Sequence, residues 1–182
     1  MTDPNLSLLD RIIELSETLS SVGRPDLFRD VYPGLYKSAI VGVGSFLEMQ
    51  FMSLIEDCAR AKSSSTWVGD FIRSKGLKRQ YHTLFDWDKM KAGPLVGFFG
   101  MDFKSTYTRA MRETGNEQSE RAFLELGFER NLIAHTYWST NPQKTPEELK
   151  DAYLLAREYP ELVRRLLLHP DFSYVETDRF GS

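Results

Sequence analysis

The stretch FLELGFERNLIAHTYW, residues 123–138, has helical apolar spacing, and Arg130, Asn131 and His135 interrupt its apolar stripes. An α-helix turns about 100° per residue, so one stripe within about 40° of Leu124 contains Phe128, Asn131, His135 and Trp138. Arg130 lies about 140° around the axis from His135, among Phe123, Leu126, Ile133 and Tyr137. The stretch therefore predicts a packed helix that carries polar groups on two different apolar stripes.

These polar residues have a structural explanation. An arginine on an apolar stripe can extend its head to water or pair with a carboxylate. Glu48 is an obvious partner, because Val41, Ser45, Met52 and Ile55 flank it at helical spacing. Near a helix C-terminus the dipole favours a charged histidine by roughly 0.3–1 kcal/mol, which could account for His135.

A functional explanation is a site for a phosphate group. The guanidinium of Arg130 offers a planar fork of donors that matches phosphoryl oxygens. His135 can take or give a proton near neutral pH, and Asn131 can orient the imidazole or contact the same phosphate. One helix cannot easily aim both stripes at one target, whereas a two-fold dimer that crosses two such helices could bring both copies into one cleft.

The rest of the chain also predicts helices, and no period-2 strand pattern stands out. We expect helices over 3–21, 36–61, 101–113, 117–138 and 146–168, with one or two short helices within 66–91. Asp3-Pro4 and Thr145-Pro146, with Glu148 following, are typical helix starts. A Pro-Gly turn makes residues 26–36 ambiguous, and the glycines of 92–100 suggest an irregular segment. The predicted architecture is an all-α bundle with two long central helices and extra short ones.

Length and composition favour one globular domain, residues 1–182, with its core at about 36–168 and a short C-terminal tail. The formal net charge of −3 gives no overall attraction to nucleic acid. Cys58, the only cysteine, fits a small buried residue, and a chain with three histidines does not suggest structural zinc. We see no signal peptide and no apolar stretch of membrane-spanning length, so we expect a cytoplasmic protein without a metal or cofactor.

Residues 73–91 form a locally basic segment, with six basic residues and two acidic ones. Interleaved aromatic residues could stack on bases while the cations follow an RNA backbone. The candidate RNA-binding residues are Arg73, Lys75, Lys78, Arg79, Tyr81 and Trp87. The alternative is a solvated helix face whose aromatic side chains pack inward.

RNLIAH at 130–135 fits the Arg-x4-His motif of the HEPN superfamily, with a polar residue directly after the arginine. Together with GLKRQYHTLFDW at 76–87 and FFGMDFK at 98–104, the chain resembles the RiboL-PSP-like HEPN branch over about 36–168. This resemblance implies a dimeric helical bundle with metal-independent endoribonuclease activity. It implies a toxin or antiviral-defence role, in which an antitoxin or an activating protein is a possible partner.

Carried over by position, the resemblance makes Arg130, Asn131 and His135 catalytic, with Glu48 and Tyr137 as possible supporting residues. The ribose 2′-OH would attack the phosphate and leave a 2′,3′-cyclic phosphate. In HEPN toxins paired with a nucleotidyltransferase, a His-x-Tyr tyrosine is modified, and Tyr137 occupies that position. Core packing is the other explanation for Tyr137. Some HEPN proteins are catalytically silent modules for RNA binding or protein assembly, which is the alternative function.

Overall fold

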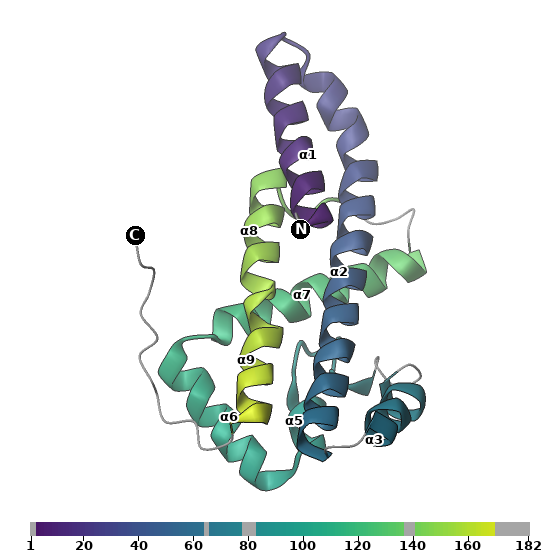
Figure 1. Ribbon diagram of the computed structural model, residues 1–182. Coiled ribbons are helices and arrows are strands. Elements are labelled where there is room, and N and C mark those ends of the chain that lie inside the picture. The colour runs from purple at the N-terminus through teal and green to yellow at the C-terminus, as the bar shows by residue number, and fades with distance from the viewer. Residues whose placement is uncertain (1–2, 64–65, 78–82, 137–140, 170–182) are drawn as a thin grey trace, which may run out of the picture.

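The protein is described here from a computed structural model that covers residues 3–63, 66–77, 83–136 and 141–169 (Figure 1). Throughout these residues the secondary structure is helical, apart from one β-bridge between Asp86 and Lys91. The elements are α1 (Pro4–Ser21), α2 (Pro25–Ser63), α3 (Thr66–Phe71), the π-helical segment η1 (Ile72–Leu77), α5 (Gly93–Phe98), α6 (Gly100–Thr114), α7 (Glu117–Thr136), α8 (Pro146–Ala156) and α9 (Glu158–Leu168). The predicted all-α class is confirmed.

The first helix begins where the sequence predicts. The Asp3 carboxylate accepts hydrogen bonds from the backbone N–H groups of Asn5 and Leu6, and Pro4 occupies the first helical position. The other Asp3 oxygen accepts from the Tyr153 hydroxyl at 2.8 Å, which joins the start of α1 to α8. This cap therefore fixes α1 beside α2 and α8, where Leu9 and Ile12 are buried (Figure 1).

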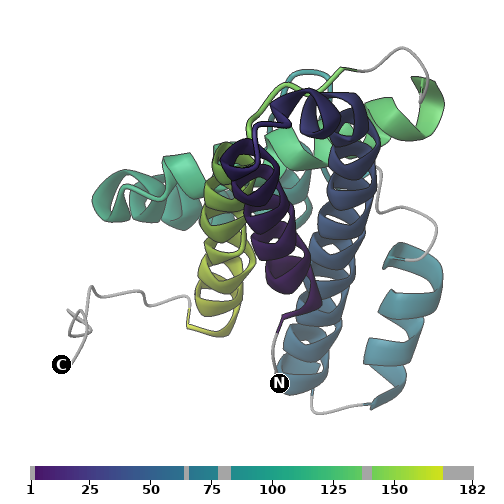
Figure 2. The same ribbon diagram turned by 90° about the horizontal axis from the view of Figure 1, so that it is seen from above.

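Helix α2 is longer than expected, because it begins at Pro25 and passes through the predicted Pro-Gly turn. Pro33 cannot donate a backbone hydrogen bond. The first turns of α2 lean away from the axis of the remainder (Figure 2). This part of α2 carries Phe28, Tyr32 and Tyr36. The rings of Phe28 and Tyr32 stack with centroids 5.1 Å apart, and the ring of Tyr32 also contacts that of Tyr36. Burial of these rings provides a reason for the helix to continue where local sequence favours a turn.

Helix α7 crosses α2 in the middle of the molecule (Figure 1). Phe123 is buried in the core there, and its ring lies 5.5 Å from Phe51 of α2, 5.1 Å from Tyr159 of α9 and 5.2 Å from Phe85. This aromatic cluster joins helices from the middle and both ends of the sequence. It sets the height at which the polar residues of α7 meet α2.

Two other predictions about helix boundaries are wrong. The expected helix over 146–168 is divided at Arg157 into α8 and α9. Pro160 lacks an N–H and its ring clashes with the carbonyl four residues earlier, so one continuous helix is disfavoured. The stretch 92–100, expected to be irregular, contains the short helix α5, with Pro94 in its first turn and Leu95 and Val96 buried. The Thr145 capping box with Glu148 is confirmed.

Within the described residues, α2 is the one helix long and apolar enough to cross a membrane by length and composition, a feature the sequence reading did not anticipate. Its apolar residues form the core, with Ile40, Val43 and Leu47 almost fully buried. Packing therefore accounts for its hydropathy.

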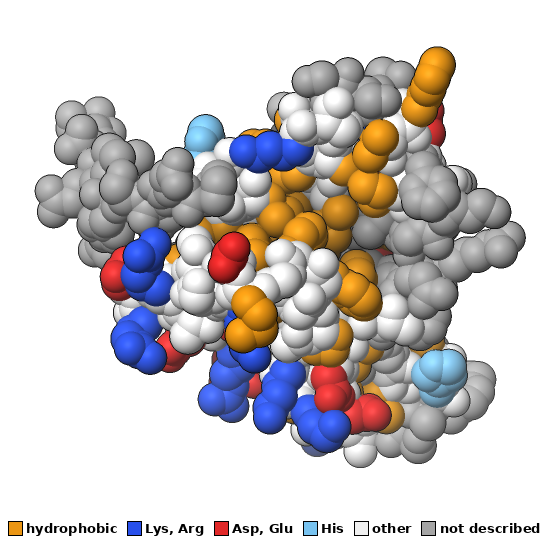
Figure 3. Space-filling view, turned by 90° about the horizontal axis from the view of Figure 1, so that it is seen from below, with side chains coloured by type: hydrophobic (Ala, Val, Ile, Leu, Met, Phe, Trp, Pro, Cys, Tyr) orange, Lys and Arg blue, Asp and Glu red, His pale blue; other side chains and the backbone are white. Residues whose placement is uncertain are grey.

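The lower end of the molecule shows apolar side chains bordered by Lys and Arg (Figure 3). Phe98 and Met101, 66% and 76% exposed, belong to the α5–α6 corner.

Candidate active site

Arg130 lies at the crossing of α7 and α2. Its Nη2 donates to Glu48 Oε2 at 2.8 Å, and both side chains are partly buried, 32% and 22% exposed. The helices approach closely here because Gly44 has no side chain: a Cβ at this position would lie 2.8 Å from Arg130 Cβ and 2.9 Å from its Cγ. The pairing of Arg130 with Glu48 predicted from sequence is confirmed.

Asn131 connects the polar groups that lie on the two apolar stripes of α7. Its Oδ1 accepts a hydrogen bond from Arg130 Nη1 at 3.0 Å, so the guanidinium contacts Glu48 on one side and Asn131 on the other. Two fixed acceptors on one planar group restrict its rotation. Because Asn131 also borders an open hollow, it forms a direct link from the arginine at the helix crossing to the solvent-facing side of α7.

Glu129 anchors the same turn of α7. Its two carboxylate oxygens accept from the Tyr36 hydroxyl and from Lys144 Nζ. Burial, followed by the hydrogen bond to Glu129, raises the pKa of Tyr36, so this phenol stays a donor at physiological pH. The Tyr32 hydroxyl donates to the Lys144 carbonyl at 2.7 Å. These bonds hold the C-terminal half of α7 against α2.

An open hollow of about 590 Å³ lies beside Asn131 and His135; we call it the His135 hollow. It is lined by Phe85, Asp86, Trp87, Asp88, Pro94, Phe128, Asn131, Leu132 and His135. His135 is exposed, whereas Asn131 is partly buried. The stripe predicted for α7 thus brings Phe128, Asn131 and His135 to one surface that a ligand can reach.

Trp87 forms a wall of the hollow and is itself packed into the protein. Its ring stacks on Phe123 with centroids 6.3 Å apart, and a Cβ at Gly127 would meet the ring at 2.1 Å. No local pattern of residues predicts this contact between Trp87 and Gly127. Of the other candidate RNA-binding residues, Arg73 is exposed and pairs with Glu56 at 3.0 Å. The Lys75 side chain, Lys78, Arg79, Tyr81, His82 and Tyr137 lie outside the described residues.

The hollow contains acidic groups that the sequence analysis did not assign to it. Asp86 and Asp88 line it together with His135. The Asp86 carboxylate accepts from Lys89, which lowers the pKa of Asp86 and keeps it ionised. No group of three or more His, Cys, Asp or Glu side chains is arranged to hold a metal ion within the described ranges. The chemistry available in the hollow is proton transfer and hydrogen bonding, with a charged guanidinium behind Asn131.

The arrangement is that of an all-α protein with a polar cluster of arginine, asparagine and histidine beside an open hollow. The chain matches no model of a known protein family. It likewise matches no curated protein sequence and no solved structure.

Proposed function

We propose that this protein is a metal-independent endoribonuclease of the HEPN type. The observation that carries the proposal is the hydrogen-bonded connection of Arg130 to Asn131, which shares the solvent-facing His135 hollow with His135. An imidazole can transfer protons, and a cation with an amide can stabilise a phosphoryl group, so these groups together can support phosphoryl transfer without a metal. The resemblance of residues 130–135 to the HEPN motif supports the same assignment.

In the proposed reaction, the ribose 2′-oxygen attacks the neighbouring phosphorus and the bond to the 5′-oxygen of the next nucleotide breaks. His135 accepts the proton of the 2′-OH, and the departing 5′-oxygen takes a proton from water. Arg130 stabilises the negative charge that accumulates on the phosphoryl oxygens. The products carry a 2′,3′-cyclic phosphate and a 5′-hydroxyl, so a strand without 2′-OH groups is not cut.

The active unit in this proposal is a homodimer. Arg130 and His135 occupy different stripes of α7, and Arg130 reaches the hollow through Asn131. A two-fold axis beside α7 would place the arginine of one copy near the histidine of the other. Mixing Arg130→Ala protein with His135→Ala protein tests this arrangement, because mixed dimers would regain cleavage that neither variant has alone. If light scattering shows exchange of subunits and no activity returns, the site is not shared.

The cleavage test uses purified protein, total RNA, a transfer RNA and a matching DNA in excess EDTA. We expect cuts in RNA only, with cyclic phosphate ends. His135→Ala should lower the rate by about 10²–10⁴-fold, the usual contribution of a positioned acid or base. His169→Ala is the matched control, since His169 is also an exposed histidine at the end of a helix. Equal rates for both variants, or cleavage that requires a metal, would overturn the assignment.

A second candidate function is a catalytically silent module that binds RNA or assembles with protein. The observation that favours it is the acidic surroundings of the site: Glu48 pairs with Arg130, and Asp86 and Asp88 line the hollow. Carboxylates there oppose the approach of a phosphate. Under this alternative, RNA stays intact while Asn131→Ala alters binding of RNA or a partner protein.

A toxin or antiviral role in the cytoplasm is part of the proposal, with an antitoxin or an activating protein as partner. Growth on induced expression tests it. Arrest with the natural chain and growth with His135→Ala indicate a constitutive toxin. Arrest only when phage infects indicates a triggered nuclease, and growth in both cases would contradict an effector role.

A further inference from the structure

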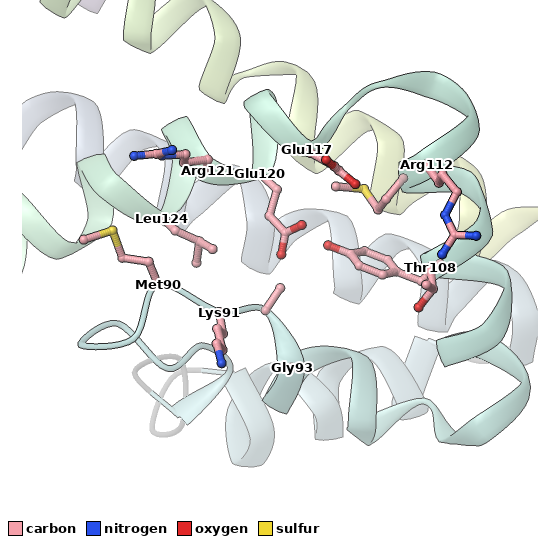
Figure 4. Close-up of a pocket in the computed structure, with 12 residues that line it drawn as sticks. Met90, Lys91, Gly93, Thr108, Arg112, Glu117, Glu120, Arg121 and Leu124 are labelled. Atoms are coloured by element: carbon pink, nitrogen blue, oxygen red, sulfur yellow. The ribbon is translucent and has the colours of Figure 1, made fainter.

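A second hollow, of about 660 Å³, lies between α6, the first turns of α7 and the segment Met90–Gly93 (Figure 4). We call it the Glu120 pocket. In Figure 4 the Glu120 side chain reaches from α7 into this space, while Arg121 and Arg112 extend near its two ends and Lys91 borders it. The volume is that of a small-molecule site. It belongs to neither the HEPN-like motif nor the His135 hollow.

Glu120 is the polar group inside the pocket. Burial raises the pKa of its carboxyl group, and the nearby Tyr107 hydroxyl and Ala92 N–H lower it in part. Tyr107 is in turn hydrogen-bonded to Tyr159, with hydroxyls 3.0 Å apart, so buried tyrosines fix the carboxylate from behind. An ionised carboxylate has about four acceptor positions. Neighbouring donors such as Tyr107 and Ala92 leave part of this acceptor capacity free on a group that lines an open pocket.

The walls and margin of the pocket have different chemistry. Met90, Met111 and Leu124 contribute apolar atoms to its lining, and the exposed Met90 offers an adaptable apolar side chain to a flat ring. The margin carries three cations, Lys91, Arg112 and Arg121, against one further carboxylate, Glu117. Arg121 also pairs with Glu125 at 2.8 Å, whereas Lys91 and Arg112 form no ion pair with another described residue. A planar polar ring inside and a phosphate at the margin would match this distribution.

We propose that the Glu120 pocket binds a guanine nucleotide, with the guanine edge on Glu120 and the phosphate at the cationic margin. Guanine presents two parallel donors, N1–H and N2–H, which can both bond to one carboxylate. Uracil has a single N–H between two carbonyl oxygens. Cytosine and adenine present one amino group beside a ring-nitrogen acceptor, which would face the carboxylate unfavourably. The carboxylate therefore selects guanine over the other three bases.

The guanine could come from a free nucleotide or from RNA. Both hollows border α7, with Glu120 in one and Asn131 and His135 in the other. At about 1.5 Å per residue, Glu120 lies roughly 17–22 Å along the helix from these two residues, a separation that a strand of a few nucleotides could cover. An RNA source rests on the proposed nuclease function, whereas binding of a free nucleotide is independent of it.

Calorimetric titration of the full chain with guanosine, adenosine, cytidine and uridine 5′-monophosphates tests the proposal. We expect the guanosine nucleotide to bind at least about tenfold more tightly than the others. Glu120→Gln, which keeps an acceptor for Tyr107 but presents an amide, should abolish this preference, whereas Glu113→Gln on the exposed surface of α6 should not. Equal binding of all four nucleotides, or no binding at millimolar concentration, would overturn the proposal.

Two further measurements protect the test against misfolding and identify the source. Lys91→Glu changes an exposed side chain and should weaken the binding of guanosine monophosphate more than the binding of guanosine. If the binding of both weakens equally, the phosphate does not lie at the cationic margin. In His135→Ala protein, which should not cleave, oligouridine with one guanosine is compared with plain oligouridine. If the oligomer that contains guanosine binds more tightly than guanosine monophosphate, the natural ligand is a guanine base within RNA. If the two bind equally, the natural ligand is a free nucleotide. If neither the oligomers nor the mononucleotides show a preference for guanine, the proposed guanine site is refuted.

Discussion

Replacing Gly44 by alanine probes the crossing of α2 and α7 on which the candidate site depends. A Cβ at this position would lie 2.8 Å from Arg130 Cβ and 2.9 Å from Cγ, and both atoms are close to the α7 backbone. They cannot swing aside as the tip of a flexible side chain could. The helices must therefore separate at this crossing, and overpacking of this kind costs about 1–3 kcal/mol.

Gly34→Ala is the matched control, because Gly34 lies in the same helix and a Cβ there meets nothing within 4 Å. Alanine is favoured over glycine in a helix by about 1 kcal/mol, so Gly34→Ala should raise Tm by about 2–4 °C for a chain of this size. Gly44→Ala receives the same helical gain and the packing cost. It should therefore melt roughly 2–12 °C below Gly34→Ala.

Thermal unfolding followed by circular dichroism measures the difference, and RNA cleavage by the same proteins measures its effect on the site. We expect Gly44→Ala to reduce cleavage because Arg130 moves from Glu48 and Asn131, while Gly34→Ala leaves the rate unchanged. If the two variants melt at the same temperature, the close approach at Gly44 does not determine how α7 sits on α2. The account of Arg130 given above would then be refuted.

Three other predictions concern single contacts. Glu48→Gln should keep the fold and lower the free energy of unfolding by about 1 kcal/mol or less, as expected for a partly exposed ion pair. It should strengthen RNA binding in a filter assay, because the charge of Arg130 is less neutralised. Weaker RNA binding would show that Glu48 mainly positions the arginine. Thr145→Ala removes the side chain that accepts from the Glu148 N–H and should cost about 1 kcal/mol, seen as a Tm lower by about 2–4 °C, whereas an unchanged Tm would mean that α8 does not need its cap. Burial raises the pKa of Glu120 above 4.5, so the folded state binds the carboxyl proton more tightly than the unfolded state does. The resulting stabilisation of the folded state is present below pH 4.5 and is lost as the pH rises through the folded pKa. A plot of Tm against pH should show this loss in the natural chain but not in Glu120→Gln.

The pH dependence of Glu120 involves groups from every element around it. Tyr107 and Arg112 of α6, Tyr159 of α9, Glu117 and Arg121 of α7, and Lys91 all line the pocket or contact its carboxylate network. Burial raises the pKa of both tyrosines, so they remain neutral throughout the accessible range. Bound guanine would lower the pKa of Glu120, and nucleotide affinity should therefore fall as the pH drops through it.

Local sequence determined the helices and their polar stripes. Apolar spacing identified α1 and α7, and the Asp3 and Thr145 caps marked the starts of α1 and α8, since these signals depend on residues within one or two turns. The pairing of Arg130 with Glu48 could also be predicted, because each is a charged residue on an apolar stripe and a buried charge needs a partner. The continuation of α2 through Pro33 could not, because the hydrogen bonds that hold Tyr32 and Tyr36 reach Lys144 and Glu129, about a hundred residues along the chain.

Tertiary structure alone decided which groups share a cavity. The residues that line the two hollows with α7 come from the segment 85–94 and from α6, and no local pattern reports where such segments pass. The ring of Trp87 lies over Gly127, forty residues away, because the missing side chain leaves room there. A sequence specifies helices through neighbours along the chain, whereas it specifies a site through steric fit between distant segments. For that reason, the stripe of α7 was readable in one dimension while Asp86, Asp88 and the Glu120 pocket became visible only in three.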